Sequence, residues 1–221
     1  MGILIKICGI NSSAAADAAA RAGADLAGFA FHPKSPRNVR PEQASALAMR
    51  LRGKMKLTVL LSDPSDDALA LAVAAVRPEF IQLHGSETPE RVAAIRARFD
   101  AGIIKVIAVA DASDLAGATR YDACADMLLF DAKPPPGAQR EGGHGFAFDW
   151  QILHGRSFAH PWLLAGGLTP DNVVRALRAS AAPGVDVSSG VETAPGQKSA
   201  ELIAQFVANA RSAQFTTEAR A

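Results

Sequence analysis

Short hydrophobic runs rich in β-branched residues recur along the chain, and most are followed by a longer alanine-rich or charged segment with helical periodicity. Eight of these runs predict strands: ILIKICG, LAGFAF, KLTVLLS, FIQLHG, GIIKVIAVA, MLLFDA, PWLLAGG and GVDVSSG. Strands that are apolar at nearly every position are typical of parallel sheets whose faces are covered by helices. The pattern therefore predicts a series of βα units.

Helices are predicted for five of the intervening segments, residues 12–23, 40–53, 64–76, 88–99 and 169–180. Thr88 and Thr169 are the predicted N-caps of the last two, because each precedes a proline, which the first helical position tolerates. Gly23 and Gly53 are predicted to end the first two helices. Residues 111–119, after the fifth strand, form a shorter pattern that favours a full helix less strongly.

Tandem βα units predict an α/β protein whose eight strands close into a single (βα)8 barrel, or TIM barrel. An open doubly wound sheet is the alternative, but no GxGxxG motif follows the first strand, and eight strands favour closure. Neither a linker nor a change in composition divides the chain, so residues 1–211 are predicted to form one catalytic barrel domain. The polar residues 212–221 are predicted to be a disordered tail.

The formal net charge is only +1, and no segment concentrates lysine and arginine, which argues against nucleic acid or an acidic membrane as a partner. The two distant cysteines, Cys8 and Cys124, form neither a disulfide framework nor a zinc site and suit a reducing cytoplasm. No apolar run approaches the roughly 20 residues of a membrane span, and no secretory signal is recognisable. We therefore expect a soluble cytoplasmic protein without a metal.

Active sites of (βα)8 barrels lie at the carboxyl ends of the strands, and the first and sixth predicted strands carry Cys8 and Asp131 near those ends. These strands lie nearly opposite each other in the ring, so the two side chains are placed to flank one small ligand. One can remove a proton while the other donates one, as an isomerase without a cofactor requires. The alternatives are that Cys8 is a small buried apolar residue and that Asp131 caps a helix or pairs with Lys133 or Arg140.

Glycines and serines follow the seventh and eighth predicted strands, where this fold often binds phosphate through backbone N–H groups. LAGGL contains Gly166 and Gly167, which allow the backbone to approach an anion, and VSSGVE contains Ser188, Ser189 and Gly190. We therefore expect a small phosphorylated ligand. The alternative for Gly166 and Gly167 is a tight turn without a ligand.

Other polar residues are predicted to line the barrel mouth. Arg37 lies in the loop FHPKSPRNV, which two prolines stiffen, and its planar fork suits a carboxylate; a solvated surface arginine is the alternative. Gln82 and His84 share one face of the fourth strand and are expected to face the ligand. His144 lies in the glycine-rich EGGHGF and is not expected to be catalytic.

Seven segments occur in an order, and at strand positions, that match one enzyme family: KICGI, GADLAGFAFHPKSPRNV, IQLHG, LLFDA, GGHGFAFDW, LAGGLTPDNV and GVDVSSGVE. From Lys6 to about Val207 the chain resembles the phosphoribosylanthranilate isomerases of tryptophan biosynthesis. The resemblance implies a cofactor-free Amadori rearrangement of N-(5-phosphoribosyl)anthranilate. One departure is Ser199, where the family often has aspartate, and we expect this change to affect a helix cap rather than the chemistry.

The resemblance also implies roles for individual residues. Cys8 would be the general base and Asp131 the general acid. Arg37 would bind the anthranilate carboxylate, and the two glycine-containing loops would hold the phosphate. A thiolate near neutral pH needs electropositive surroundings, and Lys6, on the same strand face as Cys8, is one source of positive charge. Gly9 is expected to leave room for the ligand.

Two other functions remain open from the sequence alone. The histidine-pathway isomerase performs the same kind of rearrangement, but it typically pairs two aspartates and binds two phosphates, and the first half of this chain has no counterpart of LAGGL. A barrel that only binds a phosphosugar would have no need for the acid–base pair. The oligomeric state does not follow from these residues, because a monomer and a homodimer both fit.

Overall fold

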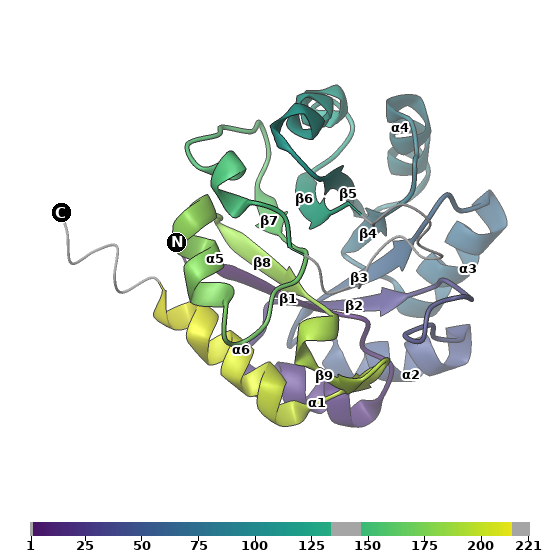
Figure 1. Cartoon of the computed structure of the whole chain (residues 1–221). Coiled ribbons are helices and arrows are strands. Elements are labelled where there is room, and N and C mark those ends of the chain that lie inside the picture. The colour runs from purple at the N-terminus through teal and green to yellow at the C-terminus, as the bar shows by residue number, and fades with distance from the viewer. Residues whose placement is uncertain (1, 134–146, 214–221) are drawn as a thin grey trace.

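The computed structural model describes residues 2–133 and 147–213 of the chain. Parallel strands form a closed barrel in sequence order, with helices around the outside (Figure 1). The strands are β1 (Leu4–Cys8), β2 (Leu26–Ala30), β3 (Lys56–Leu61), β4 (Phe80–Leu83), β5 (Gly102–Val109), β6 (Met127–Ala132), β7 (Trp162–Leu164) and β8 (Gly184–Val187). All eight predicted strands are present and β1 pairs with β8, so the predicted (βα)8 barrel is confirmed.

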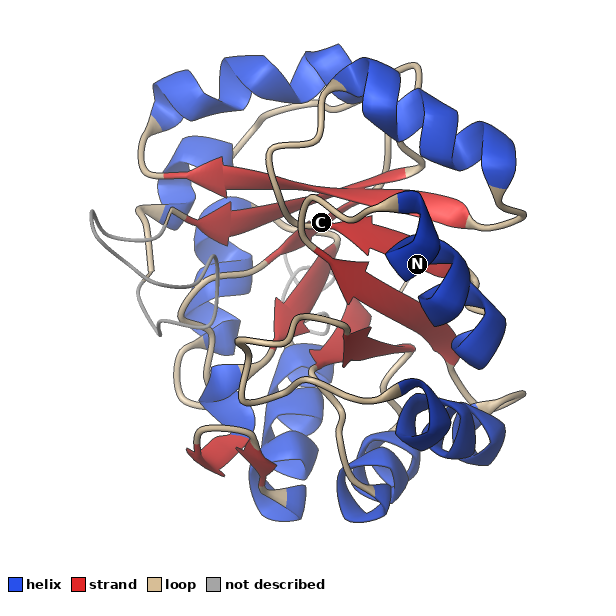
Figure 2. Cartoon of the chain, turned by 90° about the vertical axis from the view of Figure 1, so that its right-hand side faces the viewer, coloured by secondary structure: helices blue, strands red, loops and turns tan. Residues whose placement is uncertain are grey.

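The α-helices are α1 (Ser13–Ala22), α2 (Pro41–Leu51), α3 (Asp66–Val76), α4 (Pro89–Arg98), α5 (Val173–Ser180) and α6 (Ala200–Ser212). The described residues also form the 3-10 helices η1 (Ala112–Tyr121), η2 (Trp150–Leu153) and η3 (Ser189–Val191). Figure 2 shows helices on opposite sides of the strands, so the sheet is covered on its outer face. In the part of the chain that the structure describes, every helix is too short or too polar to cross a membrane.

Local hydrogen bonds explain which predicted helix ends are correct. Thr88 caps α4, because its Oγ1 accepts the backbone N–H of Arg91 at 3.3 Å. Gly23 ends α1 in the left-handed conformation, with φ of 78°. The prediction that Thr169 caps the next helix is wrong, because α5 begins only at Val173. The side chain of Asn172 instead accepts the N–H of Thr169 at 2.8 Å, which holds this segment in a turn before the helix.

The barrel interior and the layer between strands and helices contain separate hydrophobic cores. Ile5 and Ile7 of β1 are fully buried in the outer layer. The interior core consists of Leu26, Ile104, Val106, Met127, Leu129, Leu163 and Ala165. Because successive side chains alternate across a strand, Lys6 and Cys8 of β1 face the interior, toward the carboxyl ends of the strands. The alternation thus places polar groups on the interior face at the barrel mouth.

After β8 the chain forms a short hairpin, β9 (Glu192–Ala194) and β10 (Gln197–Lys198), which the hydrophobic pattern did not predict. Ser199 then caps α6, because its Oγ accepts the N–H of Leu202 at 3.2 Å, as expected for this departure from the family pattern. α6 continues through Ser212, the first residue of the predicted tail. Residues 214–221 of that tail lie outside the described residues.

Candidate active site

A cavity at the carboxyl ends of the strands brings together most of the residues that the sequence predicted. Those that line it are Cys8, Arg37, Gln82, His84, Asp131 and Ser188. The other predicted phosphate ligands, Gly166, Gly167, Ser189 and Gly190, are not among its lining residues. His144 lies outside the described residues. The barrel topology therefore places the predicted base and the predicted acid in one cavity.

Asp131, near the end of β6, contacts His84, which lines the same cavity. Its Oδ2 lies 3.3 Å from Nε2 of His84, and both side chains are 14% exposed. Oδ1 of Asp131 accepts the backbone N–H of Ala132 at 2.9 Å. Lys133, a partner considered from the sequence, instead pairs with Asp114 at 3.3 Å, and Arg140 lies outside the described residues. The carboxyl group of Asp131 is therefore available to a ligand in the cavity.

Cys8 is only 5% exposed and lies beside a buried ion pair. Nζ of Lys6 is 2.9 Å from Oδ1 of Asp186, its register partner on β8. The thiol and the ammonium group both lie next to Gly28 of β2. A Cβ atom at Gly28 would be 3.0 Å from Cys8 Sγ and 3.1 Å from Lys6 Nζ. The expectation that Lys6 places positive charge near Cys8 is confirmed. Asp186 also lines the cavity and was not predicted, although a charge inside an apolar strand was a signal for it.

Burial raises the pKa of the Cys8 thiol above its ordinary value, while the ammonium groups of Lys6 and Lys198 oppose the increase and Asp186 adds to it. For Lys6, burial alone would lower the pKa, but Asp186 and Cys8 raise it above the ordinary value, so Lys6 is charged. The thiol of Cys8 is thus protonated at neutral pH in this state. The neighbouring cation stabilises the thiolate once the proton has left.

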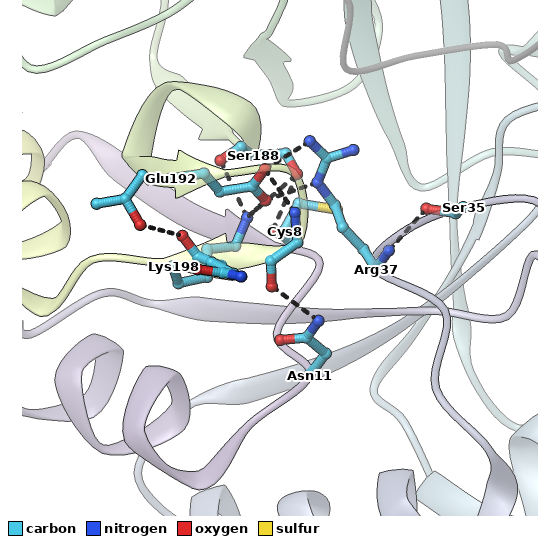
Figure 3. Close-up of polar contacts among 10 residues, drawn as sticks. Cys8, Asn11, Ser35, Arg37, Ser188, Glu192 and Lys198 are labelled. Carbon is cyan, nitrogen blue, oxygen red and sulfur yellow. Dashed lines mark hydrogen bonds and ion pairs between the residues drawn. The ribbon is translucent and has the colours of Figure 1, made fainter.

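Arg37 is a buried residue, 7% exposed, rather than a solvated surface arginine. Its Nε and Nη2 donate to Oε1 and Oε2 of Glu192 at 2.7 and 2.8 Å (Figure 3). Its stem packs on Gly9, where a Cβ would lie 2.5 Å from Arg37 Cδ. Gly9 lines the cavity, but the space beside its Cα holds the arginine stem. The expectation that Gly9 leaves room for the ligand is therefore wrong.

The β9–β10 hairpin supplies two charged residues that the sequence analysis missed, Glu192 and Lys198. Lys198 Nζ donates to Glu192 Oε1 at 2.7 Å and to the backbone oxygen of Ser188 at 3.0 Å (Figure 3). Ser188 Oγ donates to the backbone oxygen of Cys8 at 3.2 Å. Burial opposes ionisation of Glu192, but Arg37 and Lys198 outweigh it and lower its pKa. The available signal was a pair of opposite charges around the Pro-Gly turn in ETAPGQK.

Glycines in the loops after β7 and β8 allow other backbone segments to approach closely. Gly166 and Gly167 have φ of 86° and 64°, and a Cβ on Gly166 would lie 2.7 Å from the backbone nitrogen of Ala132. A Cβ on Gly190 would lie 1.8 Å from the carbonyl oxygen of Leu168. Backbone conformation and close contacts therefore account for Gly166 and Gly190 without a ligand, and phosphate binding by these loops stays a prediction.

The side-chain amide of Gln82 is a buried polar group that lines the cavity and is 1% exposed. Among the described residues, neither its Nε2 nor its Oε1 has a hydrogen-bond partner. A buried amide without a partner costs about 1–3 kcal/mol. A ligand with hydroxyl groups would satisfy this amide, so the position of Gln82 agrees with its predicted role.

The closed barrel, with a cavity at the carboxyl ends of its strands, places the chain in the class of (βα)8-barrel proteins. No cluster of three or more His, Cys, Asp or Glu side chains within residues 2–133 and 147–213 is arranged to hold a metal ion. The family model for N-(5'-phosphoribosyl)anthranilate (PRA) isomerase matches residues 5–209. The chain belongs to this family of isomerases, as the sequence motifs indicated.

Curated relatives agree with the family match. The chain is 50% identical over 211 residues to the N-(5'-phosphoribosyl)anthranilate isomerase of Paramagnetospirillum magneticum. The matched region covers 96% of this chain and 98% of the relative. It is also 50% identical over 210 residues to the enzyme of the same name from Paracoccus denitrificans, with 95% and 98% covered.

Solved structures of the same family superpose on the barrel. Phosphoribosyl anthranilate isomerase from Thermotoga maritima is 31% identical with a TM-score of 0.85, covering 95% of this chain and 99% of the relative. TrpF from Jonesia denitrificans is 38% identical with a TM-score of 0.80, covering 96% and 98%. A third structure, 29% identical with a TM-score of 0.79 and covering 95% and 99%, is the isomerase in complex with reduced 1-(o-carboxyphenylamino)-1-deoxyribulose 5-phosphate.

Proposed function

We propose that the chain converts N-(5'-phosphoribosyl)anthranilate into 1-(o-carboxyphenylamino)-1-deoxyribulose 5-phosphate, a step of tryptophan biosynthesis. The observation that carries this proposal is the presence of Cys8 and Asp131 in one cavity of a chain that belongs to this family. The histidine-pathway enzyme pairs two aspartates, whereas β1 of this chain ends in a thiol. A barrel that only binds phosphosugars would not need a base opposite an acid.

The reaction needs one proton donor and one proton acceptor. Asp131, in its protonated form, donates to the ring oxygen of the ribose, the C1–O bond breaks, and the ring opens to a protonated Schiff base. Cys8, as thiolate, removes the proton from C2, and the electron pair moves toward the nitrogen to give an enolamine. The Cys8 thiol then returns a proton to C1, and the Asp131 carboxylate takes the proton of the C2 hydroxyl, which gives the ketone and restores both groups to their starting forms. Electrons and protons balance without a cofactor.

Cys8 must lose its proton before it can act as the base in this scheme. Burial raises the pKa of the thiol, with Lys6 as the main opposing charge. The fraction of thiolate therefore rises with pH, and the rate of proton abstraction from C2 rises with it. Lys6 acts here as an electrostatic support, since its ammonium group lies beside the thiol.

Both anionic groups of the substrate have proposed partners. Glu192 occupies the Nε–Nη2 edge of Arg37, which leaves the edge formed by Nη1 and Nη2 for the anthranilate carboxylate. The phosphate is assigned to backbone N–H groups of residues 166–167 and 188–190, which follow β7 and β8. The amide of Gln82 is assigned to a sugar hydroxyl, because it lines the cavity without a partner among the described residues.

Turnover of N-(5'-phosphoribosyl)anthranilate by purified wild type beside Cys8→Ser tests this function. We expect wild type to be active and Cys8→Ser to lose about 100- to 10,000-fold in kcat, the range for loss of a general base. Asp131→Asn should show a similar loss, with unchanged circular dichroism in both variants. Wild type that binds the substrate without turnover would favour a binding barrel. Equal turnover by wild type and Cys8→Ser would leave the reaction in place but make Cys8 a buried apolar residue.

We infer a cytoplasmic location and a monomeric or homodimeric assembly. Cys8 and Cys124 are free and buried, as suits a reducing compartment. A Thermotoga maritima relative is described as a dimeric enzyme from which monomers were generated. Light scattering on the purified chain distinguishes the two assemblies.

A further inference from the structure

Glu192 connects segments that are far apart in the sequence. Its carboxylate accepts both hydrogen bonds from Arg37, which lies 155 positions earlier in the loop after β2. It also contacts Lys198 on β10 at 2.7 Å and accepts the N–H of Gly196 at 3.1 Å. The side chains of Glu192 and Arg37 are only 4% and 8% exposed, so little water competes for the contact. Glu192 is thus a fixed acceptor rather than a mobile surface carboxylate.

The position of the Arg37 guanidinium is determined from two directions. Gly9 contacts the stem, and the Ser35 hydroxyl accepts the backbone N–H of Arg37 at 3.2 Å. Glu192 binds one edge of the planar guanidinium. Because the group is rigid and planar, fixing the Nε–Nη2 edge also fixes the direction of the adjacent Nη1–Nη2 edge. Figure 3 shows this arrangement, with Arg37 between the Glu192 carboxylate and the segment that carries Ser35.

We propose that Glu192, held in place by Lys198, is a positioning residue that orients Arg37 toward the carboxylate of the anthranilate ring. This inference rests on the proposed function and adds a residue that acts through Arg37 without touching the substrate. Lys198 contacts Glu192 Oε1 and both the backbone oxygen and the hydroxyl of Ser188, and these contacts hold the hairpin against the loop after β8.

The proposal is testable because the orientation of Arg37 and the charge of Glu192 predict opposite changes in ligand affinity when the Glu192 carboxylate is removed. The negative charge of Glu192 partly cancels the positive charge of Arg37, so charge alone predicts that removing the carboxylate tightens binding of a carboxylate ligand. Orientation predicts the reverse, because a released arginine must be ordered again when the ligand binds. We hold that orientation dominates, since the contact is bidentate and buried.

The experiment measures dissociation constants for two ligands by calorimetry. The first is reduced 1-(o-carboxyphenylamino)-1-deoxyribulose 5-phosphate, and the second is the same compound without the ring carboxylate. Glu192→Gln should weaken binding of the first by about 10-fold and leave the second nearly unchanged. In an Arg37→Ala background, Glu192→Gln should add no further loss, because the residue acts through Arg37. Glu192→Asp, which keeps the charge, should recover part of the affinity for the first ligand.

The controls separate this inference from the proposed function and from misfolding. Glu201→Gln makes the same chemical change at an exposed position of α6, where the Glu201 carboxylate accepts a hydrogen bond from Gln205 at 3.3 Å, and should leave both affinities unchanged. If Glu192→Gln unfolds, Glu192→Asp carries the test with a smaller loss of the same selectivity. One outcome would overturn the inference about Glu192 but not the proposed function. In it, wild type turns over the substrate, and both Glu192 variants keep or improve their affinity for the carboxylate ligand. Wild type that neither binds nor turns over would overturn the proposed function, and the inference with it.

Discussion

Replacing Lys6 with methionine should destabilise the chain, because its partner Asp186 would be left buried without a counter-ion. Nζ of Lys6 lies 2.9 Å from Asp186 Oδ1, with side chains 0% and 9% exposed, so solvent screens the pair little. At that separation the attraction is about 6 kcal/mol for an effective dielectric constant of about 20. After desolvation is counted, breaking such a pair on one side costs about 3–5 kcal/mol. In a chain of this size, that loss corresponds to a fall of roughly 10 °C in melting temperature.

The same substitution should raise the pKa of Cys8 further, because Lys6 is the main charge that opposes the effect of burial. Asp186→Asn removes a carboxylate that raises the thiol pKa and should therefore lower it. Ultraviolet absorbance of the thiolate, followed against pH, measures both shifts. The titration belongs in a Cys124→Ala background, because burial also raises the pKa of the Cys124 thiol. The pH dependence of kcat/KM should move in the same direction as the thiolate absorbance in each variant.

Opposite shifts of the Cys8 thiol pKa in Lys6→Met and Asp186→Asn distinguish an electrostatic effect from a loss of packing. A loosened structure would hydrate the thiol and lower its pKa in both variants. A thiol pKa in Lys6→Met that is unchanged or lower than in wild type would therefore refute the reasoning. The double variant Lys6→Met/Asp186→Leu serves as a control for stability. It should be more stable than Lys6→Met alone, because no unpaired buried charge remains.

Three further changes test other contacts. Glu87→Gln should lower the free energy of unfolding by about 3 kcal/mol, as measured in urea, because the Glu87 carboxylate forms a buried 2.7 Å ion pair with Lys105 and accepts two backbone N–H groups. Arg37→Ala should raise KM with little change in kcat, and an unchanged KM would count against its contact with the carboxylate. The free energy of unfolding should decline as pH rises above about 9, because the pKa of Cys8 is raised in the folded state above its ordinary 9.0 and the unfolded chain loses its proton first. Cys8→Ser should reduce that decline, and an identical pH dependence in this variant would contradict the assigned shift.

The barrel could be predicted because its signals are local and repeated. Each strand is an apolar run, and Thr88 caps α4 through a hydrogen bond to a residue three positions later. Thr169 has the same Thr-Pro sequence but does not cap α5, because the side chain of Asn172 accepts its N–H and contacts Gly167 O at 2.9 Å. That turn depends on hydrogen bonds of the Asn172 side chain within residues 167–172, which the helical pattern does not contain.

The candidate site was predictable only where topology brings residues together. Cys8 and Asp131 stand near the ends of parallel strands, and a closed barrel gathers those ends at one mouth. Glu192 and Lys198 lie on strands of 3 and 2 residues, too short for an alternating pattern to appear. The partner of Glu192, Arg37, lies 155 positions away in the sequence. The contact between Glu192 and Arg37 depends on the packed structure, so no local sequence signal predicts it, whereas the opposite charges around the Pro-Gly turn were a local signal for the pair of Glu192 and Lys198.

Different cations serve the two anions of the proposed reaction, the anthranilate carboxylate and the thiolate of Cys8. Arg37 pairs with Glu192 through its Nε–Nη2 edge, which leaves the Nη1–Nη2 edge for the anthranilate carboxylate. Lys6 pairs with Asp186 and lies beside the thiol, where a positive charge favours the ionised form. A carboxylate bound to Arg37 would engage that guanidinium before the proton is removed. The thiolate must then depend on Lys6, whose Nζ lies beside the thiol over Gly28. Loss of Lys6 should therefore lower kcat, whereas loss of Arg37 should raise KM.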